Sequence, residues 1–143
     1  MTPTAESRIN KIFMGFIIMM FIAMIYVGYL VILPIDVLTA NNVRISSKTV
    51  RAGDSISYIV DYCKKTSHPA TVEIYLHNEK IVALPIVNSS RPEGCRKNAA
   101  RSVLIPKDTE PGTHHLEVDI TYRFNPLNSK TYHLVTPNFE VTE

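Results

Sequence analysis

An uncharged apolar run near the N-terminus constrains the fold of this chain more than any other feature. Between Ile12 and Leu33 the side chains are those of Ile, Met, Phe, Leu, Val, Ala and Tyr, interrupted by two glycines. A helix of this length rises about 33 Å, close to the roughly 30 Å hydrocarbon core of a bilayer. A core helix of a soluble domain would show a polar face, and this run has none. The sequence therefore predicts a transmembrane helix, residues 12–33, that contacts the lipid bilayer.

The same run could be an export signal that is removed or an anchor that is kept. A secretory signal has a shorter apolar region, about 7 to 15 residues, followed by small residues at the cleavage site. The nearest approach to such a site is Leu38-Thr39-Ala40, which places a bulky leucine where a small residue is needed. We therefore expect an uncleaved signal anchor.

Flanking charge favours a cytoplasmic N-terminal tail, residues 1–11. Arg8 and Lys11 directly precede the span, whereas the first basic residue after it is Arg44. The positive-inside rule then places the N-terminus in the cytoplasm. Over a wider window Lys48 joins Arg44 and balances the count, so the rule alone favours this orientation without settling it.

The two cysteines, Cys63 and Cys95, both follow the span. An isolated pair in a small domain outside the cytoplasm is typical of one disulfide, and two reduced thiols are the alternative. The disulfide interpretation supports an extracytoplasmic C-terminal domain, in the periplasm or outside the cell. The pair does not resemble a zinc site, which needs four ligands, usually in close pairs.

After a short linker, residues 34–42, the pattern changes to the alternation of half-buried strands. "SISYIVDYC", "ATVEIYLHN" and "HLEVDITYRF" each place apolar side chains on one face and polar side chains on the other. Turn residues separate such runs at short intervals. Strands are expected near 43–50, 55–63, 70–77, 81–87, 101–105, 114–124 and 130–141. Residues 43–143 are therefore predicted to form an all-β domain, an immunoglobulin-like antiparallel β-sandwich of about seven strands.

One segment, "DTEPGTHHLEV", resembles the turn into strand F of immunoglobulin-like domains, where residues follow a D-x-G-x-Y-x-C spacing. Gly112, His114 and Leu116 stand at the glycine, tyrosine and cysteine positions, while Asp108 lies too far from the glycine and the chain has no tryptophan. The resemblance implies the broad architecture. It also implies that Cys63 and Cys95 do not form the usual bridge between strands B and F.

The sequence contains no recognisable catalytic motif. It lacks a G-x-S-x-G elbow and a phosphate-binding glycine loop, and neither cysteine has a histidine neighbour. His114 and His115 are adjacent on a strand, so their side chains point to opposite faces. His115 and Glu117 share a face and are the nearest approach to a metal-binding pair.

The hairpin around "NPLNS" bears on the same question. If it pairs Tyr122 with Tyr132, then His133 faces Thr121 and lies away from Glu117. We therefore expect no cluster of metal ligands, no cofactor, no small-molecule substrate and no enzymatic activity.

The net charge of +2 does not indicate nucleic-acid binding, because the basic residues are scattered. The densest group lies in an expected loop, residues 88–100, together with an acidic residue and the second cysteine. Loops and edge strands are the usual binding surfaces of sandwich domains. The predicted partner-binding residues are Arg91, Glu93, Arg96 and Lys97 in that loop, Asn125 and Leu127 in the "NPLNS" turn, and the outward-facing Tyr75.

These features favour a non-enzymatic single-pass membrane protein that presents its β domain as a protein-interaction module. Its partner would be another membrane or extracytoplasmic protein, and its role that of an accessory subunit or an adhesive, receptor-like domain. The first alternative is a structural or envelope-associated protein of a virus or phage. The second is a membrane-anchored metal-binding or enzymatic domain.

Overall fold

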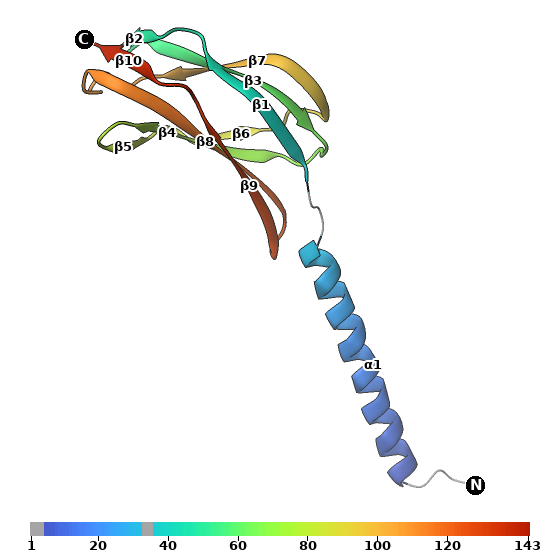
Figure 1. Cartoon of the computed structure of the whole chain (residues 1–143). Coiled ribbons are helices and arrows are strands. Elements are labelled where there is room, and N and C mark those ends of the chain that lie inside the picture. Colours follow the sequence, from blue (N-terminus) through green and yellow to red (C-terminus); the bar gives the residue numbers. More distant parts are fainter. Residues whose placement is uncertain (1–4, 33–35) are drawn as a thin grey trace. The chain divides into compact units, whose positions relative to one another are not determined.

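The computed structural model describes residues 5–32 and 36–143 and contains one helix and a mostly-β domain (Figure 1). The helix, α1, extends over Ala5–Ile32, and its segment Asn10–Ile32 has 23 residues with a mean hydropathy of 2.5. No part of that segment is buried, and it is long and apolar enough to cross a membrane. Leu33, the expected last residue of the span, lies outside the described residues, as do 1–4 of the expected tail and 34–35 of the expected linker.

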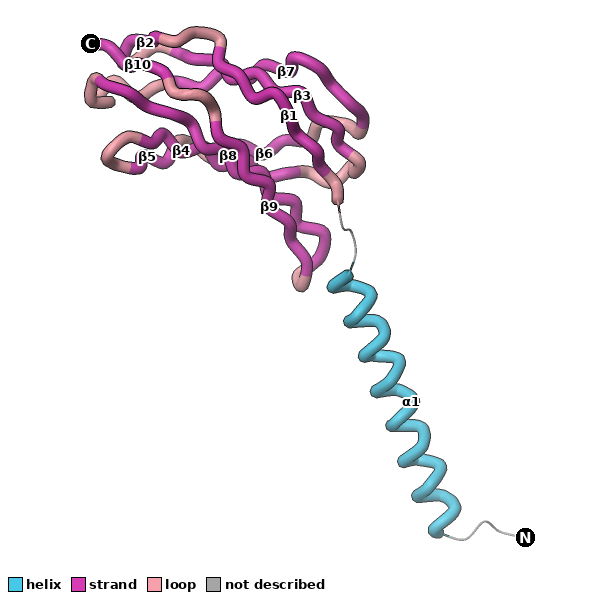
Figure 2. Tube along the Cα trace, viewed as in Figure 1, coloured by secondary structure: helices cyan, strands magenta, loops and turns pink. Residues whose placement is uncertain are grey.

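The β domain has two sheets. The strands are β1 (Leu38–Ile45), β2 (Thr49–Arg51), β3 (Ser55–Lys64), β4 (Ala70–His77), β5 (Ile81–Ala83), β6 (Val87–Ser89), β7 (Gly94–Leu104), β8 (Gly112–Asn125), β9 (Asn128–Val135) and β10 (Phe139–Thr142). The smaller sheet has the order β1-β3-β7, and the larger has the order β2-β10-β8-β4-β5, with β6 beside β4 and β9 beside β8. β2 and β10 pair in parallel, so the larger sheet is mixed, whereas the smaller sheet is antiparallel. Figure 2 shows the strands of both sheets and the loops that join them.

The core lies between the two sheets and confirms the predicted faces of the strands. β3 contributes Ile56, Tyr58 and Val60 from the smaller sheet, and β8 contributes Leu116 and Val118 from the larger. Leu116 and Val118 are completely buried. Alternate side chains of a strand point to opposite faces, so each apolar stripe enters this shared core while its polar neighbours face outward.

Several strand boundaries differ from the prediction. β1 begins at Leu38, inside the expected linker, and a bend around Ser47 separates it from β2. The expected strand 81–87 is two short strands with Pro85 between them, and the expected strand 130–141 is broken before β10 by Pro137. Proline has no backbone N–H to give to a sheet, which explains both interruptions.

The expected loop 88–100 is the largest correction. β6 covers its first two residues, and β7 begins at Gly94 and continues to Leu104. β7 is an edge strand that pairs with β3 alone among the described strands, and only Val103 of it is fully buried. Because such an edge strand is held by backbone pairing, its polar sequence "GCRKNAARS" gives no apolar alternation from which a strand could be predicted.

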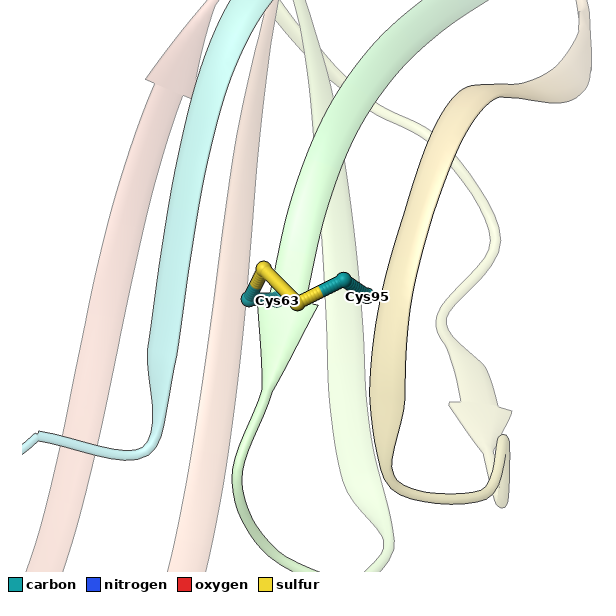
Figure 3. The surroundings of a disulfide bond; sticks show 2 residues. All are labelled: Cys63 and Cys95. Atoms are coloured by element: carbon teal, nitrogen blue, oxygen red, sulfur yellow. A yellow bond between two sulfur atoms is a disulfide. The ribbon is translucent and has the colours of Figure 1, made fainter.

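The disulfide prediction is confirmed, and the bond lies within the smaller sheet (Figure 3). Cys63 on β3 and Cys95 on β7 are directly opposite each other in the antiparallel register. They are 32 residues apart in sequence. The bond therefore joins two neighbouring strands of one sheet and does not bridge the two sheets.

Asp61 on the central strand β3 forms hydrogen bonds at two register shifts, one in its pairing with β1 and one in its pairing with β7. The register shifts next to Asn42 in β1 and next to Asn98 in β7, and both asparagines have positive φ angles, 53° and 54°. Asp61 accepts a hydrogen bond from the Asn42 side chain at 3.0 Å and another from the Asn98 backbone N–H at 2.7 Å. Asparagine tolerates this left-handed conformation better than most residues, and Asp61 supplies partners that the interrupted ladder does not.

Candidate functional site

The predicted basic residues lie along β7 and the turn before it. Arg91 is in that turn, and Arg96 and Lys97 are on β7; all three are exposed and border one open hollow of the surface. Glu93 is exposed in the same turn. The structure thus brings three of the predicted partner-binding residues together on a strand edge and its turn.

The other predicted residues have local roles. Tyr75 lies on the outer face of β4, half-buried, and its hydroxyl donates to Glu73 Oε2 at 2.8 Å. The side-chain oxygen of Asn125 accepts a hydrogen bond from the Leu127 backbone N–H at 2.9 Å, which stabilises the β8–β9 turn. Leu127 itself is 58% exposed.

An exposed apolar edge was not predicted. The short strands β5 and β6 both pair with β4, and four of the apolar residues on or next to them are exposed: Ile81 (67%), Val82 (40%), Ile86 (63%) and Val87 (40%). Only Leu84 in this segment is buried, where its backbone N–H donates to the carbonyl of Ile74. The run "IVALPIV" suggests one buried strand, but it is divided into two short strands with Pro85 between them, and of its residues only Leu84 is buried.

A second unpredicted feature is a cluster of histidines and carboxylates on the outer face of the larger sheet. His77, the last residue of β4, lies directly opposite His115 on β8, and the two rings are stacked with centroids 5.2 Å apart. Glu117 follows two residues later on the same face of β8. The ligand atoms of these three side chains all lie within 4.8 Å of one another. The expectation that no such cluster forms is therefore wrong.

The carboxylate of Glu117 is at the centre of this cluster. His77 Nε2 lies 2.9 Å from one of its oxygens, and His115 Nε2 lies 3.5 Å from the other. His133 of β9 also approaches, with its Nε2 atom 3.9 Å from Glu117 Oε2. All four side chains retain access to solvent.

The β8–β9 register explains why His133 joins the cluster. The hydroxyl of Thr121 hydrogen-bonds to Thr131, and His133 Nδ1 hydrogen-bonds to Asp119 at 2.6 Å. His133 therefore lies beside Asp119, and not beside Thr121 as expected. The hydrogen bond to the Asp119 carboxylate raises the pKa of His133, with a smaller attraction from Glu117.

A small cavity of about 60 Å³ lies between the two sheets near the buried Lys64. Lys64 is only 4% exposed, and its ammonium group donates to the backbone carbonyl of Arg91 and lies 5.6 Å from the centre of the Tyr122 ring. Desolvation lowers the pKa of Lys64. Most of the apolar side chains around it, such as Tyr58, Val60 and Tyr122, belong to the core, and Ser89, Arg91 and Arg101 line the rest of this space.

Comparison with known proteins gives only distant structural likenesses. No family model and no curated protein sequence matches the chain. Among solved structures, it is similar to the sporulation control protein Spo0M of Bacillus subtilis, with a TM-score of 0.45 and 10% identity over 76% of this chain and 51% of that one. It is also similar to the alkylpurine DNA glycosylase AlkC of Pseudomonas fluorescens, with a TM-score of 0.42 and 15% identity over 74% of this chain and 30% of that one.

A β-glucosidase of Listeria innocua gives a TM-score of 0.37 and 12% identity over 71% of this chain and 16% of that one. The chain thus covers about half or less of each of these three structures. At such low identity and TM-score, none of them bears on its activity.

Proposed function

We propose that this chain is a single-pass membrane protein that presents its β domain outside the cytoplasm as a non-enzymatic protein-interaction module. The proposal rests on two features of one chain: an unburied apolar segment of 23 residues within α1, and a β domain with an exposed apolar edge. The disulfide supports an oxidising compartment, because such bonds are rare in proteins of the cytoplasm.

We further propose that the domain is an immunoglobulin-like sandwich. With β1, β3 and β7 as strands A, B and E, and β4, β8 and β10 as strands C, F and G, the strand order agrees with that architecture. His114 supports the same assignment. It is buried at the start of β8, and its Nε2 donates to the backbone carbonyl of Glu110 at 2.9 Å. This is the kind of upstream backbone contact that a tyrosine corner makes.

The edge formed by β5 and β6 is the proposed centre of the binding surface. Ile81 and Ile86 are its most exposed apolar residues, and the turn directly after β6 carries the charged Arg91 and Glu93. An apolar centre with a charged rim is typical of protein interfaces. The neighbouring edge strand β7, with Arg96 and Lys97, is the second proposed contact, because an unpaired strand edge accepts an added strand.

Membrane insertion and orientation can be tested with the full chain in its native membrane. The proposal expects it to remain in the membrane after alkaline carbonate extraction, and expects protease added from the extracytoplasmic side to digest the β domain. Recovery of the chain in the soluble fraction would refute the anchor. Full protection of the β domain from protease, together with free thiols at both cysteines, would refute the orientation.

The binding surface can be tested by photo-crosslinking, with a photoreactive amino acid placed singly at Ile86 or Lys97. Thr113, an exposed residue on β8, is the matched control position. We expect one recurrent partner protein from Ile86 or Lys97 and none from Thr113. Equal capture at all three positions, or no recurrent partner, would contradict the interaction module.

A further inference from the structure

The histidine cluster on the outer face of the larger sheet is assembled by three strands. The antiparallel pairing of β4 with β8 places His77 across from His115, and the alternation of β8 returns Glu117 to the same face. β9, on the other side of β8, adds His133. Rigid strands of one sheet therefore bring two imidazoles and one carboxylate within 4.8 Å of one another, and place a third imidazole 3.9 Å from that carboxylate.

The spacing of these groups fits a tetrahedral metal ion. Bonds of about 2.0 to 2.1 Å from zinc to nitrogen or oxygen place neighbouring tetrahedral ligands about 3.3 Å apart. The contact of His77 with Glu117 Oε2 is 2.9 Å and that of His115 with Glu117 Oε1 is 3.5 Å, on either side of the tetrahedral value. Because the two histidines contact different oxygens, binding of one ion requires the Glu117 carboxylate to turn, within a group whose ligand atoms already lie within 4.8 Å of one another.

His133 approaches the fourth position and is already oriented by a second carboxylate. Its Nδ1 atom is bonded to Asp119 at 2.6 Å, which leaves Nε2 directed toward Glu117 at 3.9 Å. Histidines that bind metals commonly donate their other ring N–H to a carboxylate, which sets both the tautomer and the ring orientation. Asp119 is thus placed as a positioning residue for a ligand.

The kind of ligand restricts the metal. Imidazole nitrogen with a single carboxylate suits zinc and the other late divalent transition metals, whereas magnesium and calcium require mostly oxygen ligands. Two further carboxylates lie on this face and are already engaged: Asp119 bonds to His133, and Glu73, across from it, accepts the Tyr75 hydroxyl. We infer that this face binds one Zn²⁺ ion through His77, His115 and Glu117, with His133 as the fourth ligand. This inference goes beyond the proposed interaction module and does not depend on it.

The test uses the full chain in detergent micelles with a purification tag that contains no histidine. After treatment with a chelator, isothermal titration with zinc chloride should give one ion bound per chain. Cobalt(II) should bind at the same place and give the visible absorption of a tetrahedral site. Thermal unfolding should move to higher temperature with zinc, because an ion that binds only the folded state stabilises it.

Variants distinguish the site from adventitious binding. Glu117→Gln and His115→Ala should abolish stoichiometric binding, and Asp119→Asn should weaken it by about 10- to 100-fold. His68→Ala and Glu110→Gln are the matched controls, since His68 bonds to Thr66 and Glu110 pairs with Lys80, both outside the cluster. Circular dichroism of each metal-free variant checks its fold, and these outward-facing substitutions should leave it unchanged.

Three results would overturn the inference. They are the absence of stoichiometric zinc in the wild-type chain, equal affinity in the well-folded Glu117→Gln variant, and equally tight binding of magnesium or calcium. None of these bears on the partner captured from the β5–β6 edge, so failure of the metal site and failure of the interaction module can be told apart.

Discussion

Replacing Cys63 and Cys95 together by serine removes the cross-link between β3 and β7. The chain between these cysteines contains β4, β5 and β6, all of which belong to the other sheet. In the folded domain the two cysteines already face each other across a ladder of backbone hydrogen bonds. The main effect of the bond is therefore expected in the unfolded chain, where it restrains a segment that includes Val72, Ile74, Leu76 and Leu84 of the core.

The magnitude follows from the separation of 32 residues. Closing a loop of this length lowers the entropy of the unfolded chain by about 12 cal/mol/K, which corresponds to about 3.7 kcal/mol at 25 °C. That is a large part of the roughly 5 to 15 kcal/mol by which a typical domain is stable. For a domain of about 100 residues, the same change lowers Tm by about 15 to 30 °C.

The assay is thermal and urea unfolding of the full chain in detergent micelles. Near-ultraviolet circular dichroism follows the tyrosines, five of which belong to the β domain and two, Tyr26 and Tyr29, to α1, whose helix dominates less there than in the far-ultraviolet signal. The Cys63→Ala/Cys95→Ala variant separates loss of the bond from the polarity of serine. Reduced wild-type chain gives a third, mutation-free measurement of the same quantity.

A loss below about 1 kcal/mol in all three measurements would refute this reasoning, since the loop-closure value is several times larger. Such a result would mean that the unfolded chain already keeps β3 and β7 close together without the bond. A loss confined to the serine variant would instead point to a local effect of the hydroxyl groups.

Three further predictions follow from the core, from Asp61 and from α1. Leu116→Ala should lower the free energy of unfolding, measured by urea denaturation, by about 3 to 5 kcal/mol, because Leu116 is completely buried. Leu104 is 64% exposed, so Leu104→Ala is the control and should change the same free energy by about 0.5 kcal/mol or less. A side-chain amide and a backbone N–H that donate to Asp61 lower its pKa. The stability that Asp61 contributes is thus fully present above its unfolded pKa of about 3.9 and is lost as the pH falls through its lower pKa in the folded domain. A carbon-13 NMR titration of the Asp61 carboxyl with a midpoint at or above about 3.9 would contradict the lowered pKa. Ile22→Arg should disfavour membrane integration by about 2.5 to 3.5 kcal/mol while Ile22→Leu should not, as measured by the membrane-bound fraction.

The alternation of apolar residues was enough to predict which strand faces are buried. In β3, β4 and β8 almost every second side chain is apolar, with the buried Lys64 and His114 as exceptions, and most of these apolar side chains form the core. This local pattern can be read from sequence because the side chains of a strand alternate between its two faces, whatever its neighbours are. The edge strand β7 was missed because backbone pairing, which leaves no pattern in the side chains, holds it in the sheet.

For the candidate sites too, the sequence revealed what is local along the chain and missed what depends on strand pairing. The basic residues of β7 and its turn were recognised from their sequence, although their strand was taken for a loop. The histidine cluster was missed because His77 and His133 are far from Glu117 along the chain. Its only local signal is the alternation of His115, Glu117 and Asp119 on one strand face.

The sequence by itself determined the apolar helix, the β character of the rest of the chain and most of its inward-facing residues, and it favoured a disulfide between the two cysteines, which the structure confirms. These features depend on composition and on the short-range geometry of a helix or strand. Only the tertiary structure decided which strands are neighbours and in what register, and thus that His77, His133 and Glu117 meet on one face. A register shift of two residues changes which side chains lie opposite each other while each strand still presents the same face to the core, so the pattern of burial does not determine which residues meet on the outer face.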